Sequence, residues 1–296
     1  MKALKVNGET QIYGLIGWPV AHTFSPPMHN AAFKACGINA VYLPFPVKEK
    51  NLKYVLRSLN TLGFKGVNVT IPYKERVMPY LHRIEFSASL VGAVNTIIIK
   101  NNKFIGHNTD WIGFIMSLKK DAKFNPGGKR AFIFGAGGAA RAVTMALANS
   151  GLSHLCIIDI MREKGKRLAL NINKHFKKTR AEFIATLKNK EAQQKLKEAD
   201  LIINATGIGM HKKDSSLVKP QWVRKQQLAC DLIYNPPLTN FLKVYKKKGA
   251  KILNGEGLLL YQGAEAFELF TSRAAPLNIM RKVLREQITS SQHRCS

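Results

Sequence analysis

A glycine-rich turn between an apolar strand and a helix-forming stretch constrains this chain more than any other feature. The apolar run Arg130–Phe134 leads directly into GAGGAAR at 135–141, and a helix-forming stretch continues to Ser150. In such a turn the backbone can approach a pyrophosphate, and the helix N-terminus offers free N–H groups and a positive dipole end. Ala140 stands where the G-x-G-x-x-G pattern has its third glycine, a position that tolerates alanine because its role is close helix packing. A tight turn alone would mean little, but the strand and helix around it predict a dinucleotide-binding unit.

The stretch after this turn alternates strand-like and helix-like segments, as in a doubly wound parallel sheet. Its predicted strands are His154–Asp159, Leu201–Ala205, Leu228–Tyr234 and Lys251–Leu253. A basic helix is predicted from Arg162, and the periodicity of 187–199 predicts a further helix on the surface.

The first third of the chain predicts a separate α/β unit with its own sheet. One helix is predicted from Ser25, where two prolines follow as a helix-start signal, and another over Lys48–Leu62. The predicted strands are Gln11–Trp18, Val41–Val47, Gly66–Ile71 and Ala93–Ile99, and parallel pairing is the expected arrangement. Asp110–Lys120 predicts a linking helix, and 257–270 and 276–288 predict two closing helices without new strands.

Length and composition exclude several classes of protein. The 296 residues, 46% of them hydrophobic, suffice for two cores. No apolar run reaches the roughly 18 residues of a membrane span, and Met1–Gln11 has no apolar signal core. The cysteines are too widely spaced for a zinc pattern, so we expect reduced thiols, no metal and a cytoplasmic protein; they are Cys36, Cys156, Cys230 and Cys295.

The formal net charge of +28 raises nucleic-acid binding as a hypothesis. The lysines, however, are dispersed over predicted helix faces, as in 164–167, 174–178 and 243–248, and aromatic residues are not interleaved with them. This dispersion favours solvated surfaces and disfavours a nucleic-acid partner. The positive field also favours the approach of an anionic substrate and cofactor.

Asp159, at the end of the strand that follows the glycine turn, bears on cofactor choice. A carboxylate there can accept hydrogen bonds from both adenosine ribose hydroxyls and would repel a 2′-phosphate. The same residue can cap a helix before Met161, and the two roles are compatible. Arg162 and Lys164 are candidates to pair with a phosphate instead. We expect NAD as the preferred cofactor, with NADP as the alternative.

Polar residues interrupt apolar stretches where strands are predicted to end. Each has an ordinary explanation, such as a solvated lysine or a helix cap. Their concentration at strand ends is more informative, because open α/β sheets bind ligands there. These residues are Thr23, Ser25, Asn68, Thr70, Lys74, Asn95, Asn108, Asp110 and Gln262.

On these residues the chain resembles the shikimate/quinate dehydrogenase family over nearly its whole length. The matching motifs are GWPVAHTFSP at 17–26, KGVNVTIPYKE at 65–75, GAVNT at 92–96, NTDWIGF at 108–114, GAGGAARA at 135–142, NAT at 204–206 and YQGAEAF at 261–267. The resemblance implies an α/β substrate domain, 1–109 with 256–296, whose C-terminal helices pack back on it, and a Rossmann dinucleotide-binding domain with a doubly wound parallel sheet, 110–255.

The resemblance also implies roles for single residues. Lys74 and Asp110 match the family's catalytic pair. Substrate contacts are implied for Thr23, Ser25, Thr70, Lys74, Asn95, Asp110, Tyr234 and Gln262. Cofactor contacts are implied for Gly135, Ala136, Gly137, Gly138, Ala139, Asp159, Arg162, Thr206, Leu232 and Gly255.

The chemistry of such a reaction suits these residue types. Oxidation of a secondary alcohol needs a hydride acceptor and a group that takes the hydroxyl proton, and Lys74 can take it while Asp110 orients both. Burial would lower a lysine pKa from about 10.4, whereas an ionised Asp110 would raise it, so the sequence assigns an acid/base pair without placing the proton.

Three positions depart from the family pattern. Thr23 replaces a serine of the usual Ser-x-Ser, which changes the room around the substrate carboxylate. His107 stands where members often carry Asp or Tyr. Ile160 replaces the arginine that NADP-using members carry after the second Rossmann strand.

The expected activity is NAD(P)-dependent interconversion of shikimate and 3-dehydroshikimate, with quinate as a second candidate substrate and a monomer or homodimer as the assembly. A catalytically silent sensor of nucleotide or ring acid is the main rival, and the presence of both Lys74 and Asp110 argues against it. A nucleic-acid-binding protein is supported by charge alone.

Overall fold

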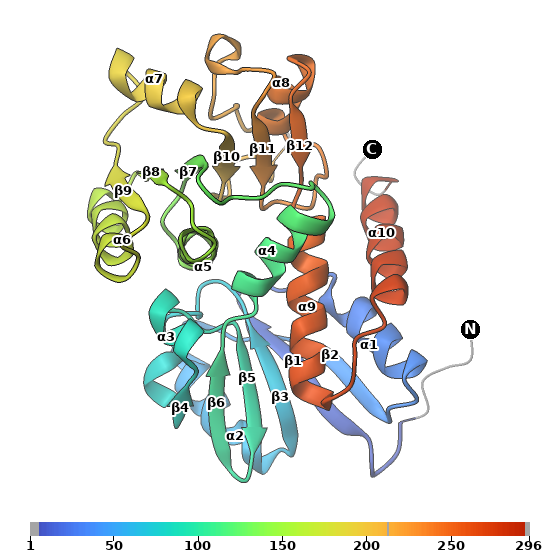
Figure 1. Ribbon diagram of the computed structural model, residues 1–296. Helices are drawn as coiled ribbons and strands as arrows, with labels where there is room; N and C mark the ends of the chain where they lie inside the picture. Colours follow the sequence, from blue (N-terminus) through green and yellow to red (C-terminus); the bar gives the residue numbers. More distant parts are fainter. Residues whose placement is uncertain (1–5, 212, 294–296) are drawn as a thin grey trace. The chain divides into compact units, whose positions relative to one another are not determined.

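The computed structural model describes residues 6–211 and 213–293. The chain divides into two compact units, Met1–Gly113 with Leu260–Ser296 and Phe114–Leu259. Each is built on one six-stranded sheet (Figure 1). Among the described residues, no helix is both long and apolar enough to cross a membrane.

The sheet of the first unit has the strand order β2-β1-β3-β5-β6-β4. Its strands are β1 (Gln11–Gly17), β2 (Ala40–Pro46), β3 (Phe64–Val69), β4 (Arg83–Ile84), β5 (Thr96–Lys100) and β6 (Lys103–His107). β1 pairs in parallel with β2 and β3, as predicted.

The prediction of parallel pairing is wrong for β5, which runs antiparallel to β3 and to β6. The reason is a two-residue turn between β5 and β6. Asn101 and Asn102 have φ of 49° and 60°, and a turn with two positive φ angles matches the twist of a hairpin. The chain therefore reverses its direction at this point. Strands β4 and β6 and helix α3 (Phe86–Val91) were not predicted from the sequence.

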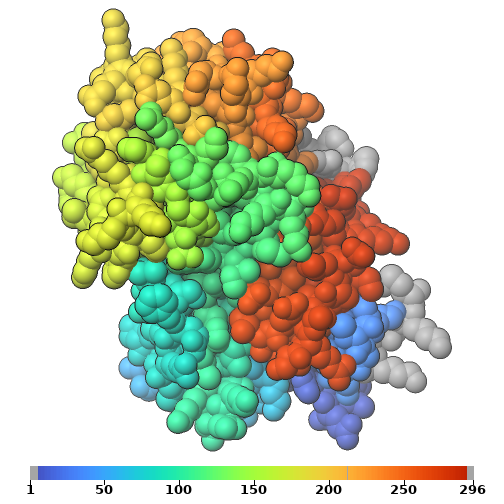
Figure 2. Space-filling model, viewed as in Figure 1, coloured from blue at the N-terminus to red at the C-terminus, as the bar shows by residue number. Residues whose placement is uncertain are grey.

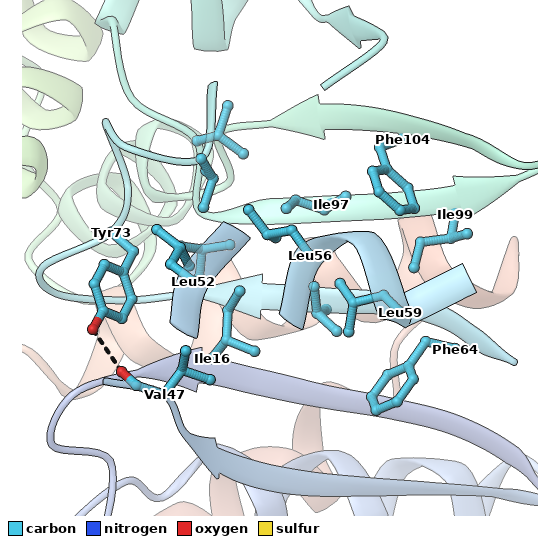
Figure 3. Packing of buried hydrophobic residues seen from close by; sticks show 14 of the residues in the cluster. Ile16, Val47, Leu52, Leu56, Leu59, Phe64, Tyr73, Ile97, Ile99 and Phe104 are labelled. Atoms are coloured by element: carbon cyan, nitrogen blue, oxygen red, sulfur yellow. Dashed lines mark hydrogen bonds between the residues drawn. The ribbon is translucent and has the colours of Figure 1, made fainter. Parts of the chain in front are cut away.

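Helix α2 (Leu52–Thr61) covers one face of this sheet. Its Leu52, Leu56 and Leu59 pack against Ile16, Phe64, Ile97, Ile99 and Phe104 (Figure 3). At the end of this cluster the hydroxyl of Tyr73 donates a 2.5 Å hydrogen bond to the carbonyl of Val47, which ties the loop after β3 to the end of β2.

The other face of the sheet carries α1 (Ser25–Ala35) and the C-terminal helices. Tyr13, three residues before Ile16 and therefore on the opposite face, stacks obliquely on Phe33 of α1 and Phe270 of α9 (Glu256–Thr271). Helix α10 (Leu277–His293) packs beside α1, and Figure 2 shows the C-terminal helices in red against the blue N-terminal part of the unit. The prediction that the C-terminal helices pack back on the first domain is confirmed.

The second unit has an entirely parallel sheet with the order β12-β11-β10-β7-β8-β9. This is the 3-2-1-4-5-6 order of the Rossmann fold, so the predicted doubly wound sheet is confirmed. The strands are β7 (Arg130–Phe134), β8 (His154–Ile158), β9 (Arg180–Phe183), β10 (Leu201–Asn204), β11 (Leu228–Asp231) and β12 (Lys251–Leu253). The helices wholly within this unit are α5 (Gly138–Asn149), α6 (Arg162–His175), α7 (Lys190–Glu198) and α8 (Asn240–Lys247), while α4 (Asp110–Lys120) begins in the first unit and continues into the second.

Three cysteines lie among the described residues, and all are free thiols: Cys36, Cys156 and Cys230. Burial raises the pKa of the Cys156 thiol to about 12, so this thiol stays protonated and unreactive at neutral pH. Cys295 lies outside the described residues.

Candidate active site

The predicted substrate residues of the first unit lie together at the side of the sheet where β1 and β3 end, which we call its strand-end edge. Thr23 and Ser25 follow β1, and Thr70 and Lys74 follow β3, which is parallel to β1. Asn95 precedes β5, whose first residue pairs with His107 at the end of β6, so the loop before α4 reaches the same edge. The antiparallel hairpin that the sequence analysis missed is what brings Asn95 and Asp110 to the carboxyl ends of β1 and β3.

Lys74 and Asp110 form an ion pair at this edge. The Lys74 ammonium lies 2.5 Å from Oδ2 of Asp110, and their side chains are only 15% and 8% exposed. A pair this buried holds each partner in one geometry, and neither charge is left without a counter-charge. The structure thus places together the two groups that the resemblance implied as catalytic.

The amide of Asn95 fixes the other oxygen of the carboxylate. Its Nδ2 donates to Oδ1 of Asp110 at 2.9 Å and to the Thr109 hydroxyl at 3.0 Å. Its Oδ1 accepts the backbone N–H of Thr109 at 2.8 Å, which determines which way the amide points. Both oxygens of Asp110 are therefore held, one by a cation and one by an amide.

Gln262 belongs to the same group. Its Oε1 lies 3.5 Å from the Thr109 hydroxyl, which is a donor to it. Gly113 permits this approach, because a Cβ there would lie 2.7 Å from the backbone nitrogen of Gln262. Helix α9 is thereby held against the start of α4 within the first unit.

The hydroxyls of Thr23 and Ser25 lie at the start of α1, and the hydroxyl of Thr70 lies just after β3. The Thr23 hydroxyl accepts the backbone N–H of Ser25 at 3.3 Å, which places the two side chains together. Thr70 is held by its N–H, which donates to the carbonyl of Ile16 at 2.9 Å. Gly17 leaves room for Thr70, since a Cβ there would lie 2.3 Å from the Thr70 methyl.

Three further predicted site residues belong to the second unit. Tyr234 follows β11, and its burial raises the pKa of the phenol. Leu232 and Gly255 lie against each other, because a Cβ on Gly255 would be 2.1 Å from the Leu232 carbonyl oxygen. Only glycine permits this close approach.

A pocket of about 740 Å³ lies at the carboxyl ends of β7, β8 and β10, where strand order reverses. The glycine turn forms one wall. Gly135 has φ of 108° and would place a Cβ 2.8 Å from the Ala205 carbonyl oxygen. A Cβ on Gly137 would meet no protein atom within 4 Å, so its missing side chain leaves room on the pocket side. Gly138 and Ala139 begin α5, whose first turn has free N–H groups.

These features fit a dinucleotide. The left-handed glycine, the open side of Gly137 and the helix N-terminus together allow close approach of a pyrophosphate. Ala136 and Thr206 also line the pocket, as do residues that the sequence analysis missed: Ala185, Thr186, Leu187, Ile208, His211 and Asp214. The missed residues come from loops after β9 and β10, whose positions depend on tertiary packing.

Asp159 lines this pocket, and both of its oxygens already have backbone partners. Oδ2 accepts the N–H of Ala136 at 2.7 Å, and Oδ1 accepts the N–H of Met161 at 2.6 Å. The carboxylate therefore fastens the glycine turn to the start of α6. Lys164 also lines the pocket, whereas Arg162 is exposed and is not part of its lining.

No group of three or more His, Cys, Asp or Glu side chains within 6–211 and 213–293 is arranged to hold a metal ion.

Comparison with known proteins identifies the family. Residues 15–97 match the shikimate dehydrogenase substrate binding domain, and residues 255–285 match the shikimate 5′-dehydrogenase C-terminal domain. The chain is 46% identical over 286 residues to a shikimate dehydrogenase (NADP(+)) of Desulforamulus reducens, covering 96% of this chain and 98% of the relative. The chain belongs to the shikimate dehydrogenase family.

Solved structures of shikimate dehydrogenases have the same fold. One, in complex with NADP+, superposes with a TM-score of 0.88 at 42% identity and covers 96% of this chain and 98% of its own. Another, from Listeria monocytogenes in complex with shikimate and NAD, has a TM-score of 0.88 at 32% identity and covers 95% and 98%. The NADP(+) in the relative's name gives no support to the NAD preference predicted from the sequence.

Proposed function

We propose that this chain catalyses the reversible oxidation of shikimate to 3-dehydroshikimate with a nicotinamide dinucleotide. The observation that carries the proposal is the buried Lys74–Asp110 pair at the strand-end edge that also bears Thr23, Ser25 and Thr70. The substrate is assigned to the first unit, and the cofactor to the pocket of the second. A bound nicotinamide supplies the hydride acceptor or donor.

The residues of the first unit account for the rest of the chemistry. The hydroxyls of Thr23 and Ser25 bind the substrate carboxylate, and Thr70, Asn95 and Gln262 bind ring hydroxyls. The Lys74–Asp110 pair takes the proton from the reacting hydroxyl during oxidation and returns it during reduction. A silent sensor would have no use for such a pair.

Quinate is the second candidate substrate, and Thr23 is the residue that makes it a candidate. Quinate carries one more hydroxyl on the ring carbon that bears the carboxylate, next to the Thr23 side chain. A contact of this size changes selectivity by about 1–3 kcal/mol, so any preference would be partial.

The chain's own residues favour NAD over NADP, although its relatives are named for NADP(+). Asp159 places a negative charge in the pocket beside Ala136. Ile160, which is 97% exposed, stands where NADP-using members carry an arginine. Lys164 opposes this preference because it brings a positive charge to the same pocket.

The test of the proposed activity is the Lys74→Ala variant. Loss of the acid/base group should lower turnover by about 10²–10⁴-fold. The matched control is Lys65→Ala, which removes the same charge from an exposed position in β3. Initial rates with shikimate and with quinate, each with NAD and NADP, would measure this. Near-normal turnover of folded Lys74→Ala would refute the assigned role, and a wild-type chain without activity on either acid would refute the function.

A further inference from the structure

A buried chain of hydrogen bonds runs from the edge strand β2 to the Lys74–Asp110 pair. It starts at the hydroxyl of Tyr42, which donates to Oδ1 of Asn68 at 2.7 Å. Nδ2 of Asn68 donates to the hydroxyl of Thr96 at 2.9 Å, and that hydroxyl donates to Oδ1 of Asn95 at 3.0 Å. Nδ2 of Asn95 then donates to Asp110. Tyr42 and Thr96 are fully buried, and the other members are at most 6% exposed.

All hydrogen bonds of this network run in the same direction, from the Tyr42 hydroxyl as first donor to the Asp110 carboxylate as last acceptor. Each amide accepts through its oxygen and donates through its nitrogen, and the Thr96 hydroxyl accepts from one amide while donating to the next. The last acceptor is a carboxylate, which offers no proton when ionised. Hydrogen bonds aligned in one direction polarise one another, so the network strengthens the bond that Asn95 donates to Asp110.

The far end of the chain is held rigidly. The ring of His29 stacks on that of Tyr42 with centroids 4.4 Å apart and planes 4° apart. The backbone N–H and C=O of Tyr42 both bond to the side-chain amide of Asn30, at 2.8 and 3.0 Å. Tyr42 is therefore a fixed donor and not a side chain that can follow movements of Asn68.

We propose that Thr96 is a positioning residue for the acid/base pair, anchored through Asn68 by Tyr42. Its hydroxyl joins the two amides and, with the backbone N–H of Thr109, keeps the Asn95 amide turned so that it donates to Asp110. This inference rests on the proposed function, because it assigns Thr96 to the reaction of the Lys74–Asp110 pair.

Titratable side chains beside this hydrogen-bond network include Lys74, His107 and His29, and Tyr42 is itself a member of the network. Lys74 faces Asp110 directly. His107 of β6 pairs across the sheet with Thr96, and its burial lowers the pKa of the imidazole, so it is neutral at pH 7. His29 and Tyr42 at the far end are neutral as well, because burial lowers the pKa of His29 to about 3 and raises that of Tyr42. His107, His29 and Tyr42 therefore add no charge beside the network at pH 7.

The first experiment compares Thr96→Val with Thr96→Ser. Valine keeps the shape but can neither accept from Asn68 nor donate to Asn95, whereas serine keeps the hydroxyl. Thr96→Val should lower kcat about tenfold with a smaller change in the KM for shikimate, since misplaced catalytic groups act on turnover. Thr96→Ser should restore kcat.

The matched control is Ile97→Val, which trims the neighbouring residue of β5 on the opposite face of the sheet. It should lower the thermal unfolding midpoint without lowering kcat. The second experiment is a double-mutant cycle. Tyr42→Phe should lower kcat in the wild-type background and have no further effect in Thr96→Val, because the chain is already interrupted there.

The outcomes separate the two claims. A wild-type chain that reduces 3-dehydroshikimate supports the proposed function whatever Thr96 does. If Thr96→Val then has wild-type kcat, or if Tyr42→Phe acts equally in both backgrounds, the positioning role is overturned. If Thr96→Ser fails to rescue activity while remaining folded, the methyl group and not the hydroxyl is what matters, and the inference fails.

Discussion

At the scale of single residues, Asp159 and Lys164 bring opposite charges to the same pocket, so under the proposed function we expect them to act on cofactor choice in opposite directions. Like charges about 4 Å apart repel by roughly 4 kcal/mol at an effective dielectric constant of 20, and solvent at this half-buried position reduces that figure. The two hydrogen bonds from Ala136 and Met161 spread the charge of the carboxylate without removing it. The local charge should outweigh the diffuse field of the +28 chain, because selectivity is a difference between two ligands at one site.

We expect Asp159→Asn to shift the ratio of catalytic efficiencies toward NADP by about tenfold or more, equivalent to about 1.4 kcal/mol. Lys164→Ala should shift the same ratio toward NAD. Lys166→Ala, also on α6 but outside the pocket lining, is the charge-matched control and should leave the ratio unchanged. kcat/KM with each cofactor measures the effect. A wild-type protein that prefers NADP would contradict this role of Asp159. So would an Asp159→Asn variant whose ratio of catalytic efficiencies equals that of the wild type.

His29 makes stability depend on pH. Neither ring nitrogen has a hydrogen-bond partner among the residues that the structure describes, and burial lowers the pKa of the imidazole from 6.5 to about 3. Between these values the unfolded chain binds a proton that the folded chain does not. The free energy of unfolding therefore falls as pH drops below about 6.5, with a slope of up to ~1.4 kcal/mol per pH unit.

His29→Leu removes this titration and two unpartnered polar atoms. We expect its free energy of unfolding in urea to exceed that of the wild type by more at pH 5 than at pH 7.5. His22→Gln, at an exposed position in the same unit, serves as the control and should follow the wild type. If the free energy of unfolding changed with pH equally in His29→Leu and in the wild type across this range, His29 would not be the source of the pH dependence.

The candidate site residues could be chosen from the sequence because polar side chains at the ends of parallel strands converge on one edge of a sheet. Lys74, Asn95 and Asp110 could be chosen in this way, and they do lie within hydrogen-bond reach. The orientation of the Asn95 amide could not be predicted, because it depends on the Thr109 N–H and the Thr96 hydroxyl, which reach it only after β5 and β6 have paired.

At the scale of elements, the β5–β6 hairpin shows where periodicity failed. The run of isoleucines predicted β5, but β6 continues after only two residues, and the segment was not recognised as a second strand. The signal was the pair Asn101–Asn102, because asparagine adopts positive φ more readily than other residues with a side chain. Strand β9 was missed for a different reason, since four residues of mixed polarity carry little periodicity.

We expect Asn102→Val to lower the free energy of unfolding by about 1–2 kcal/mol, because a β-branched residue is strained at a φ of 60°. Asn102→Gly should be close to neutral. Lys103→Val, one residue later in β6, is the control, and valine should be tolerated there because the position is extended. Urea unfolding measures all three. Equal stability of Asn102→Val and Lys103→Val would show that the turn does not require positive φ.

At the scale of the whole molecule, charge is the dominant feature. The chain carries 46 Lys and Arg against 18 Asp and Glu, so most of its cations have no acidic partner to pair with. The described ion pairs other than Lys74–Asp110, such as Arg130–Glu198 and Lys195–Glu191, include at least one substantially exposed member and are worth about 0–1 kcal/mol each. Repulsion among the remaining cations therefore opposes folding.

Added salt should consequently stabilise the fold. Raising the ionic strength from about 0.01 M to 0.15 M shortens the screening length from about 30 Å to 8 Å, which removes long-range repulsion but weakens exposed pairs only slightly. We expect the free energy of unfolding in urea to rise with NaCl over this range. Over the same range kcat/KM for shikimate should fall several-fold, because screening also weakens the attraction of an anionic substrate. NaCl can be compared with equal ionic strengths of KCl to exclude an ion-specific effect. A fall in stability with salt would mean that the surface ion pairs outweigh the repulsion, and that the +28 charge is arranged in compensating networks after all.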